Sequence, residues 1–250
     1  TMQRVFARMH AAAAHESSVL IVGETGTGKE LVARAIHYNS PRAQHPFVPV
    51  NCAAIPRELF ESELFGHRKG AFTGASRDTL GLVRAADKGT LFLDEIIEMP
   101  PETQVRLLRV LQERRVRPVG EVEESPVDVR FLAATSLPGE RAIAEGRLRQ
   151  DLFYRIGVIT IQLPPLRERA EDIPFLVQHF IEGFNRVFPN KVESVDPRAL
   201  DLLTAYPWPG NVRELSNVIE SIFAMGAHGR ALPEDLPEQF RAHRRFAAAA

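Results

Sequence analysis

One short glycine-rich stretch, GETGTGKE at Gly23–Glu30, limits the possible fold more than any other part of the sequence. It follows the apolar run Val19–Val22 and precedes LVARAI, whose apolar residues recur at helical spacing. A GxxxxGK segment between a strand and a helix surrounds phosphate oxygens with backbone amides, and the helix N-terminus favours the anion. We therefore predict a nucleotide-phosphate site; a glycine-rich turn without a ligand is the alternative. The predicted ligands are Gly23, Glu24, Thr25, Gly26, Thr27, Gly28, Lys29 and Glu30.

Short apolar runs alternate with longer amphipathic stretches through the first two thirds of the chain. One amphipathic stretch begins at Pro101 and carries Val105, Leu108 and Leu111 as an apolar stripe, which is typical of a helix. Strands that alternate with helices favour an α/β fold with a parallel sheet between helices. We predict a parallel five-stranded sheet, with strands at residues 19–22, 47–50, 90–93, 129–134 and 157–163.

The pattern changes after LPPLRERAEDIP, and we predict no strand between Ile173 and Phe240. Apolar residues at helical spacing predict three helices there, the last at Asn211–Met225. We therefore expect an α/β subdomain over residues 1–168, a small all-α lid over 169–240 and a tail or linker over 241–250.

Composition narrows the class of protein. A net charge of −1 gives no reason to expect a surface that coats nucleic acid. The one cysteine, Cys52, rules out a disulfide within the chain, which favours a reducing compartment. No apolar run approaches the roughly 18 residues that a membrane-spanning helix needs, so we expect no membrane contact.

An acidic pair, Asp94 and Glu95, closes the apolar run TLFLDE. Ligands of open α/β sheets bind at the carboxyl ends of the strands, where this pair is expected. We predict that Asp94 holds a magnesium ion and that Glu95 orients the attacking water, since phosphoryl transfer depends mostly on positioning and charge stabilisation. A pair that merely caps the next helix is the alternative.

Two arginines, Arg149 and Arg155, stand six residues apart, which is not the spacing of a same-face helical pair. They are either solvated surface charges or arginine fingers that reach the γ-phosphate held by a neighbouring subunit. The residues alone leave both interpretations open.

Five motifs in order, GETGTGKE, ELFGHRKGAFTGA, GTLFLDEI, LPPLRERAEDI and WPGNVREL, resemble the central AAA+ domain of bacterial enhancer-binding proteins, which activate sigma-54 RNA polymerase. The likeness runs from about Met2 to about Pro237, and GAFTGA distinguishes this family from other AAA+ ATPases. Glu30, which stands where phosphate loops usually carry Ser or Thr, is usual in this family.

The resemblance implies a bacterial cytoplasmic ATPase that uses ATP and Mg²⁺ and forms a ring of six or seven subunits. It also implies that the GAFTGA segment is a protruding loop that grips sigma-54. Gly70 and Gly74 would let the backbone reorient, and Phe72 would be the apolar anchor. The residues of this predicted partner site are Gly70, Ala71, Phe72, Thr73, Gly74 and Ala75.

Further roles follow from the resemblance, position by position. Asn51 matches a switch residue that holds Glu95, although an Asn after a strand is more often a helix cap. Arg149 and Arg155 match two fingers that act on a neighbour, and Arg213 matches a lid arginine that senses nucleotide. Ile173 is expected to line the adenine site. Arg167 and Arg169 lie in the family's LRER motif but could equally be surface residues of the hinge. Trp208 is expected to pack in the core, and Asn211 to cap a helix.

Three positions depart from the family pattern. Ser136 stands where an Asn is usual at the first sensor, which bears on how hydrolysis couples to motion. Ile97 takes a position usually held by Gly, and a β-branched residue would restrict the backbone if φ had to be positive. Arg68 replaces a common acidic residue before the loop, and changes the charge at its base.

Three functions compete on these grounds. The first is an ATP-hydrolysing ring that remodels sigma-54 polymerase. The second is a regulatory assembly domain that binds nucleotide with little or no turnover, suggested by Ser136 and Ile97. The third is a remodeller of another protein or of DNA, which leaves GAFTGA unexplained. Enhancer-binding proteins usually carry a C-terminal helix-turn-helix domain and often an N-terminal sensory domain, and neither fits among these 250 residues. We therefore expect no sequence-specific DNA binding by them.

Overall fold

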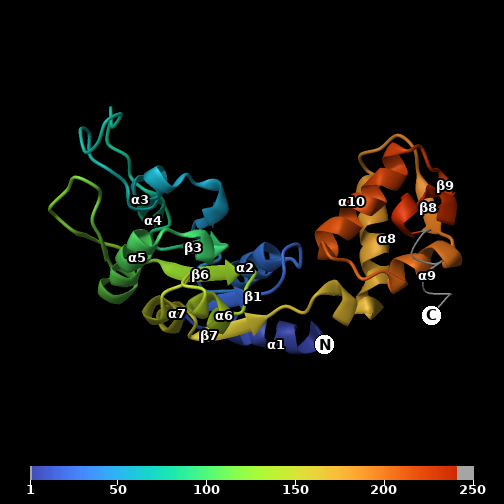
Figure 1. The fold of residues 1–250 in the computed structure, drawn as a ribbon, viewed down its shortest axis with the longest axis horizontal. Helices are drawn as coiled ribbons and strands as arrows, with labels where there is room; N and C mark the ends of the chain where they lie inside the picture. Colours follow the sequence, from blue (N-terminus) through green and yellow to red (C-terminus); the bar gives the residue numbers. More distant parts are fainter. Residues whose placement is uncertain (1, 241–250) are drawn as a thin grey trace. The chain divides into compact units, whose positions relative to one another are not determined.

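The computed structural model describes residues 2–240, which form two compact units (Figure 1). The sheet unit comprises Met2–Gly23 and Lys29–Leu163, and the lid unit comprises Glu24–Gly28 together with the chain from Pro164 onward. The division that we expected near residue 168 lies close to this break, but five residues of the phosphate loop belong to the lid unit. The expected tail at 241–250 lies outside the described residues.

A parallel five-stranded sheet organises the sheet unit and confirms the predicted fold class. Its order is β2-β3-β6-β1-β7, with every neighbouring pair parallel. All five predicted strands end within one residue of the observed ends. The strands are β1 (Val19–Val22), β2 (Phe47–Asn51), β3 (Thr90–Asp94), β6 (Arg130–Thr135) and β7 (Ile159–Gln162).

Each face of this sheet is covered by helices. Alternation along the strands sends Val19 and Ile21 to one face and Leu20 to the other. On the first face, α1 (Met2–Ala13) and α2 (Lys29–Tyr38) pack against the strands. The second face is covered by α3 (Phe60–Phe65), α4 (Leu82–Ala85), α5 (Pro101–Glu113), α6 (Gly139–Ala144) and α7 (Gln150–Ile156). Short 3₁₀ turns follow two strands, η1 (Cys52–Ala54) with η2 (Arg57–Leu59), and η3 (Ile96–Glu98).

Two neighbouring loops project from one end of the sheet unit. In Figure 1 the loop that carries GAFTGA rises beside a second loop at residues 117–124. The second loop joins β4 (Arg115–Val116) to β5 (Ser125–Pro126), an antiparallel pair that the sequence pattern did not predict. His67 ties the two loops together, because it bridges both Thr79 and Val119.

Three helices form most of the lid unit, as predicted: α8 (Ile173–Phe184), α9 (Pro197–Ala205) and α10 (Asn211–Ala224). Trp208 lies fully buried among them, and its indole N–H donates to the Leu203 carbonyl at 2.8 Å. Our expectation of no strand in this region is wrong. The lid unit contains a short parallel pair of strands, β8 (Val192–Val195) and β9 (Gly229–Ala231). It also contains three 3₁₀ turns, η4 (Leu166–Glu168), η5 (Ala170–Asp172) and η6 (Pro233–Asp235). Among residues 2–240, no helix combines the length and apolarity needed to cross a membrane.

Candidate nucleotide and partner sites

The carboxyl ends of four parallel strands bring the chemistry of the sheet unit to one edge. Gly23, Asn51, Glu95 and Ser136 each end or directly follow β1, β2, β3 and β6. The strand register sets Val22 beside Thr135 and Asn51 beside Asp94. This is the edge at which open α/β sheets bind their ligands.

Lys29 and Glu95 meet at this edge. The Lys29 Nζ lies 3.0 Å from Glu95 Oε1 and also donates to the Gly23 carbonyl at 2.9 Å. The Lys29 side chain is 7% exposed, so the ammonium group is held in a largely dry position. The first residue of α2 therefore places its charge against the carboxylate that we predicted to act on water.

Ser136 holds the other oxygen of Glu95. Its backbone N–H donates to Glu95 Oε2 at 2.9 Å, and its hydroxyl donates to the same oxygen at 2.8 Å. Glu95 adopts a left-handed backbone conformation, with φ of 51°. A non-glycine residue in this region costs roughly 1 kcal/mol or more, and such residues cluster at functional sites. Ser136 thus offers two hydrogen-bond donors to a single oxygen of Glu95.

No hydrogen bond joins Asn51 to Glu95 among the described residues. Its carboxamide oxygen accepts the Ala53 N–H at 3.0 Å, which caps η1. The alternative interpretation of this residue, a helix cap, describes its present contact. Ile97 raises no backbone difficulty, because it lies buried in η3 and the positive φ falls at Glu95 instead.

Asp94 lies half-buried beside this cluster, and its Oδ1 accepts the Glu95 N–H at 3.1 Å. Burial raises the pKa of Asp94, and the charge of Lys29 opposes that rise. A carboxylate that is costly to desolvate is stabilised by a divalent cation, so Asp94 fits a magnesium ligand. Within residues 2–240, no group of three or more His, Cys, Asp or Glu side chains is placed to hold a metal ion. Glu30 instead pairs with Arg34 at 2.7 Å.

In the lid unit, the phosphate-loop residues Glu24–Gly28 pack against the start of α10. The Gly26 carbonyl accepts the N–H groups of Val212 at 3.0 Å and Arg213 at 3.3 Å. A Cβ at Gly26, where φ is 81°, would lie 2.3 Å from the Gly210 oxygen. Glycine is therefore required here by both conformation and close approach. Arg213, which we predicted to sense nucleotide, has an exposed side chain at this place.

Three further residues of the lid unit hold the phosphate loop, and the sequence motifs did not assign them to it. Asn211 does not cap α10: its Nδ2 donates to Glu24 and to the Thr25 carbonyl at 3.2 and 3.0 Å. Arg167 donates to both carboxylate oxygens of Glu24, at 2.9 and 2.6 Å, and this bond lowers the pKa of Glu24.

Arg169 is the third of these residues. Its side chain is 6% exposed and donates to the Thr27 carbonyl at 3.1 Å. The only sequence signal for Arg167 and Arg169 was their place in the LRER motif, which left a surface role equally open. Ile173, which we assigned to an adenine site, is fully buried in the core of the lid unit.

Arg149 and Arg155 lie on or beside α7 in the sheet unit. The exposed Arg149 side chain pairs with Asp151, with N–O distances of 3.1 and 2.8 Å. The Arg155 guanidinium donates to the Leu111 carbonyl at 3.2 Å. Both side chains have partners within their own chain, and within residues 2–240 neither forms a hydrogen bond or ion pair with Glu95.

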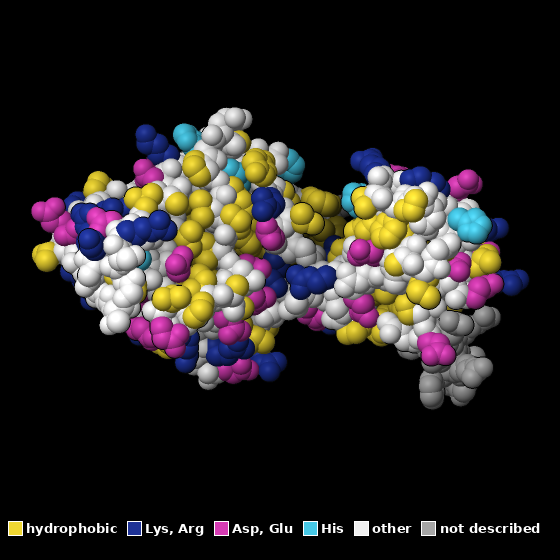
Figure 2. Space-filling model, turned by 90° about the horizontal axis from the view of Figure 1, so that it is seen from above, with side chains coloured by type: hydrophobic (Ala, Val, Ile, Leu, Met, Phe, Trp, Pro, Cys, Tyr) yellow, Lys and Arg dark blue, Asp and Glu magenta, His cyan; other side chains and the backbone are white. Residues whose placement is uncertain are grey.

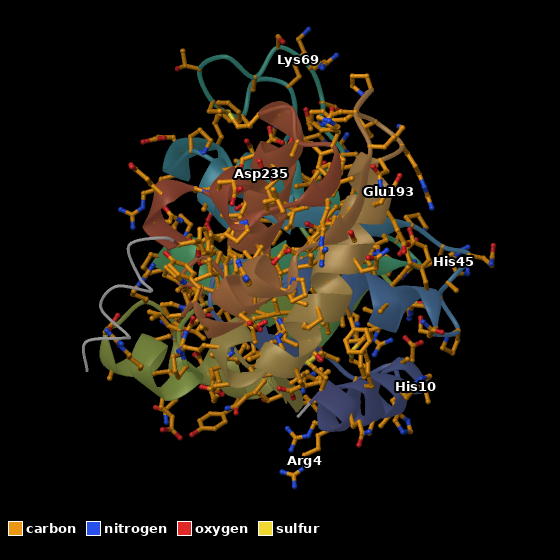
Figure 3. The ribbon with its side chains drawn as sticks, turned by 90° about the vertical axis from the view of Figure 1, so that its right-hand side faces the viewer. Arg4, His10, His45, Lys69, Glu193 and Asp235 are labelled. Carbon is orange, nitrogen blue, oxygen red and sulfur yellow. The ribbon has the colours of Figure 1, made fainter. Side chains whose placement is uncertain are left out.

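The GAFTGA segment forms a tight turn at the end of the projecting loop. The Gly70 N–H donates to the Ala75 carbonyl at 2.8 Å, and the Ala75 N–H donates to the Phe72 carbonyl at 3.0 Å. Phe72 remains 38% exposed with its ring against His67, at 5.0 Å between centroids. Lys69 lies on the outer part of this loop (Figure 3). Gly70 and Gly74 have φ of 82° and 104°, and a Cβ at either would meet nothing within 4 Å.

Charged side chains surround the base of this loop. Arg68 pairs with Asp78 at 2.7 Å and with Glu121 of the second loop at 2.5 Å, and Asp78 also accepts the Lys69 N–H at 2.8 Å. Figure 2 shows charged side chains gathered at this end of the sheet unit and hydrophobic ones across its middle. Arg68, a departure from the family pattern, thus joins the two loops at their base.

The chain is similar to known proteins over most of its length. A family model described as the sigma-54 interaction domain matches residues 1–162, and one described as the AAA+ ATPase lid domain matches residues 167–250. The Escherichia coli regulatory protein AtoC is 54% identical over 226 residues, which are 90% of this chain and 49% of AtoC. The transcriptional regulator NtrC of Salmonella typhimurium is 50% identical over 236 residues, 94% of this chain and 50% of NtrC.

A solved structure is also similar. NtrX from Brucella abortus in complex with ATP superposes with a TM-score of 0.86 at 37% identity, over 96% of this chain and 53% of that one. The chain spans about half the length of the curated relatives that it matches. Because the first family model covers well over half of the sequence, the chain belongs to the sigma-54 interaction domain family of AAA+ proteins.

Proposed function

We propose that this chain hydrolyses ATP and, as a subunit of a ring of six or seven copies, uses the energy to remodel sigma-54 RNA polymerase. One observation carries the catalytic part: Glu95 is held by Lys29 on one oxygen and by Ser136 on the other. The NtrX structure, whose fold the chain shares, contains ATP. The nucleotide is thus the natural ligand of the Gly23–Glu30 loop.

Each group at the strand ends has a definite task in this proposal. Lys29 binds the β- and γ-phosphates, whose larger negative charge draws its ammonium group away from Glu95 Oε1. Glu95, still held by Ser136, then accepts a proton from the attacking water and orients it. Asp94 would hold a magnesium ion, whose positive charge would offset the charge on the phosphates. Arg213 of the same chain, and Arg149 and Arg155 of a neighbouring chain, stabilise the charge that develops on the γ-phosphate.

The GAFTGA loop is the proposed contact with sigma-54. Phe72 presents an apolar ring beside polar and charged groups, on a segment whose glycines occupy open space. Burial of such an exposed ring by a partner lowers the free energy of the complex. Specific DNA binding is not part of the function proposed for these residues.

The decisive experiment is capture of purified sigma-54 by this chain without nucleotide, with ADP and with ADP–aluminium fluoride. We expect capture only with the transition-state mimic, and loss of capture in Phe72→Ala. Phe175→Ala is the matched control, because Phe175 is a 78% exposed phenylalanine on α8 of the lid unit. ATP hydrolysis is measured on the same preparations.

The outcomes separate the candidate functions. Nucleotide binding and ring formation without hydrolysis or capture would establish the regulatory assembly function instead. Hydrolysis with no capture in any nucleotide state would show that the ATPase acts on another target. Equal loss of capture in Phe72→Ala and Phe175→Ala would remove the loop from the proposal.

A further inference from the structure

A buried glutamine, Gln104 on α5, uses both ends of its carboxamide in hydrogen bonds to backbone. It is 1% exposed. Its Nε2 donates to the Met99 carbonyl and to the Arg147 carbonyl, both at 2.9 Å. Its Oε1 accepts the N–H of Arg149 at 2.9 Å.

These bonds fix a segment that has no regular structure of its own. Residues 146–149 lie between α6 and α7, and Arg149 directly precedes the first residue of α7. Leu148 anchors the segment in the core, while Gln104 holds the backbone on either side of it. Because a carboxamide is planar and rigid, three bonds to it define both the position and the direction of the segment.

The same helix also holds the second arginine. The Leu111 carbonyl, near the end of α5, accepts from the Arg155 guanidinium at 3.2 Å. Gln104 thus fixes the backbone of Arg149 near one end of α5, and Leu111 contacts the side chain of Arg155 near the other. One helix bears on both arginines.

Through the same Nε2 atom that bonds Arg147, Gln104 also contacts the segment that follows the acidic pair. Met99 comes directly after η3, which itself follows Asp94 and Glu95. Within η3, Glu98 pairs with Arg147 at 2.5 Å. Gln104 therefore joins the segment that leaves the hydrolytic carboxylates to the segment that carries Arg149.

We infer that Gln104 is a positioning residue for Arg149, and that it couples the acidic pair of one subunit to the arginines that this subunit offers to the next. The inference rests on the proposed function, in which Arg149 and Arg155 act on a neighbour's nucleotide. A change at Glu95 that moves Met99 is transmitted through the carboxamide to the Arg149 backbone. The hydrolytic sites of neighbouring subunits are then linked through the body of each subunit.

The test uses Gln104→Met, which keeps the length of the side chain and removes all three hydrogen bonds. Gln112→Met is the matched control, since Gln112 is an exposed glutamine on the same helix. We expect kcat for ATP hydrolysis to fall on the order of 10- to 100-fold in Gln104→Met, the loss that misplacement of a catalytic group causes. The KM for ATP is expected to stay unchanged, because its own phosphate loop is intact.

Mixed rings distinguish positioning from a general structural role. Gln104→Met subunits retain their own hydrolytic groups, and Lys29→Ala subunits retain correctly placed arginines. We therefore expect a mixture of the two variants to hydrolyse ATP several-fold faster than the sum of each alone. Arg149→Ala mixed with Lys29→Ala is the reference for recovery in trans.

Recovery for Arg149→Ala but not for Gln104→Met would overturn the inference, because the defect would then lie in the variant's own site. An unchanged kcat in Gln104→Met would overturn it as well. If thermal unfolding shows that Gln104→Met is not folded, Gln104→Glu replaces it. This variant keeps the acceptor for the Arg149 N–H, so we expect a smaller loss of kcat, which mixed rings recover. Failure of hydrolysis in the unsubstituted chain, or of recovery for Arg149→Ala, would instead overturn the proposed function.

Discussion

The chain carries two glycine-rich loops that differ in how tightly their glycines are enclosed. In the phosphate loop, Gly26 has φ of 81° and a Cβ there would lie 2.3 Å from the Gly210 oxygen. In the projecting loop, Gly70 has nearly the same φ, 82°, and a Cβ there would meet nothing within 4 Å. The same residue type serves close packing in one loop and conformational freedom in the other.

Their lysines differ in the same direction. Lys29 is 7% exposed and paired with Glu95, whereas Lys69 is exposed on the outer part of its loop. A loop that binds a small anion needs its groups fixed before the ligand arrives, because pre-organisation reduces the free-energy cost of binding. A loop that grips a protein gains from adaptability, and its ordering cost is met when the partner binds.

Replacing either lysine with alanine in separate variants should give the largest difference in ATP hydrolysis between the two loops. Lys29→Ala is expected to lower ATP hydrolysis by about 100-fold or more, since it removes a charged group at the phosphates. Lys69→Ala should leave hydrolysis at the unsubstituted rate. Comparable rates for the two variants in a phosphate-release assay would contradict the different roles assigned to the two lysines.

Asp94→Asn tests the buried edge of the sheet. We expect magnesium-dependent hydrolysis to fall on the order of 100-fold, because the variant loses the charge that holds the metal. Thermal stability should rise at neutral pH, because the raised pKa of Asp94 means that its charged form opposes folding.

The pH dependence of that stability gain follows from the same sign. The gain is complete above the folded-state pKa of Asp94 and disappears as the pH falls below the ordinary value of 3.8. Thermal unfolding of both proteins across this range checks it. A variant that is less stable than the parent at pH 7 would contradict the argument from burial.

The glycines provide a test of intermediate size. Gly70→Ala is expected to lower the free energy of unfolding by about 1 kcal/mol, from the backbone conformation alone. Gly26→Ala should add the cost of a clash with backbone, about 1–3 kcal/mol more. Chemical denaturation measures both changes, and a larger loss for Gly70→Ala would reverse the comparison.

The smallest expected effect concerns acid. Each loop has an arginine–carboxylate pair, Arg167 with Glu24 and Arg68 with Asp78. The hydrogen bond from Arg167 lowers the pKa of Glu24. The pKa of Asp78 is lowered mainly by the hydrogen bond from the Lys69 N–H and next by the one from Arg68. Lowered values stabilise the fold above the ordinary carboxyl pKa and lose this effect as the pH falls through the folded-state value.

Because the pairs are exposed, we expect Arg167→Met and Arg68→Met to change the free energy of unfolding little at pH 7. Each variant should slightly reduce the difference in the free energy of unfolding between pH 7 and pH 3. Arg68→Met is also expected to increase tryptic cleavage after Lys69, a site that both proteins retain, since the change frees the loop from Glu121. An unchanged cleavage rate would show that the turn at Gly70–Ala75 is sufficient to hold the loop.

The sheet could be predicted well because its strands are apolar runs that end in, or are followed by, a polar residue or glycine. Val19–Val22 and Thr90–Asp94 are examples, and their order along the chain leaves few alternatives to a parallel sheet. The pair β8–β9 could not be predicted because Gly229–Ala231 has neither length nor apolar periodicity. Such strands exist only through their pairing.

The candidate site could be predicted where local motifs define it. Lys29 and Glu95 each lie in a motif, and the order of the strands brings them together. Asn51 and Asn211 were harder, because an Asn serves equally as a cap and as a tertiary contact. Asn211 binds the Thr25 carbonyl across 186 positions in the sequence, and nothing in its neighbourhood distinguishes that contact from capping.

Trp208 is the single tryptophan of the chain, and it lies fully buried in the lid unit beside Tyr206 and Phe240. The intrinsic fluorescence of the protein therefore has one dominant source in one unit. An emission change on addition of nucleotide would report on the lid directly, without a label and without interference from the sheet. The molecule contains its own optical probe for the part that grips the phosphate loop.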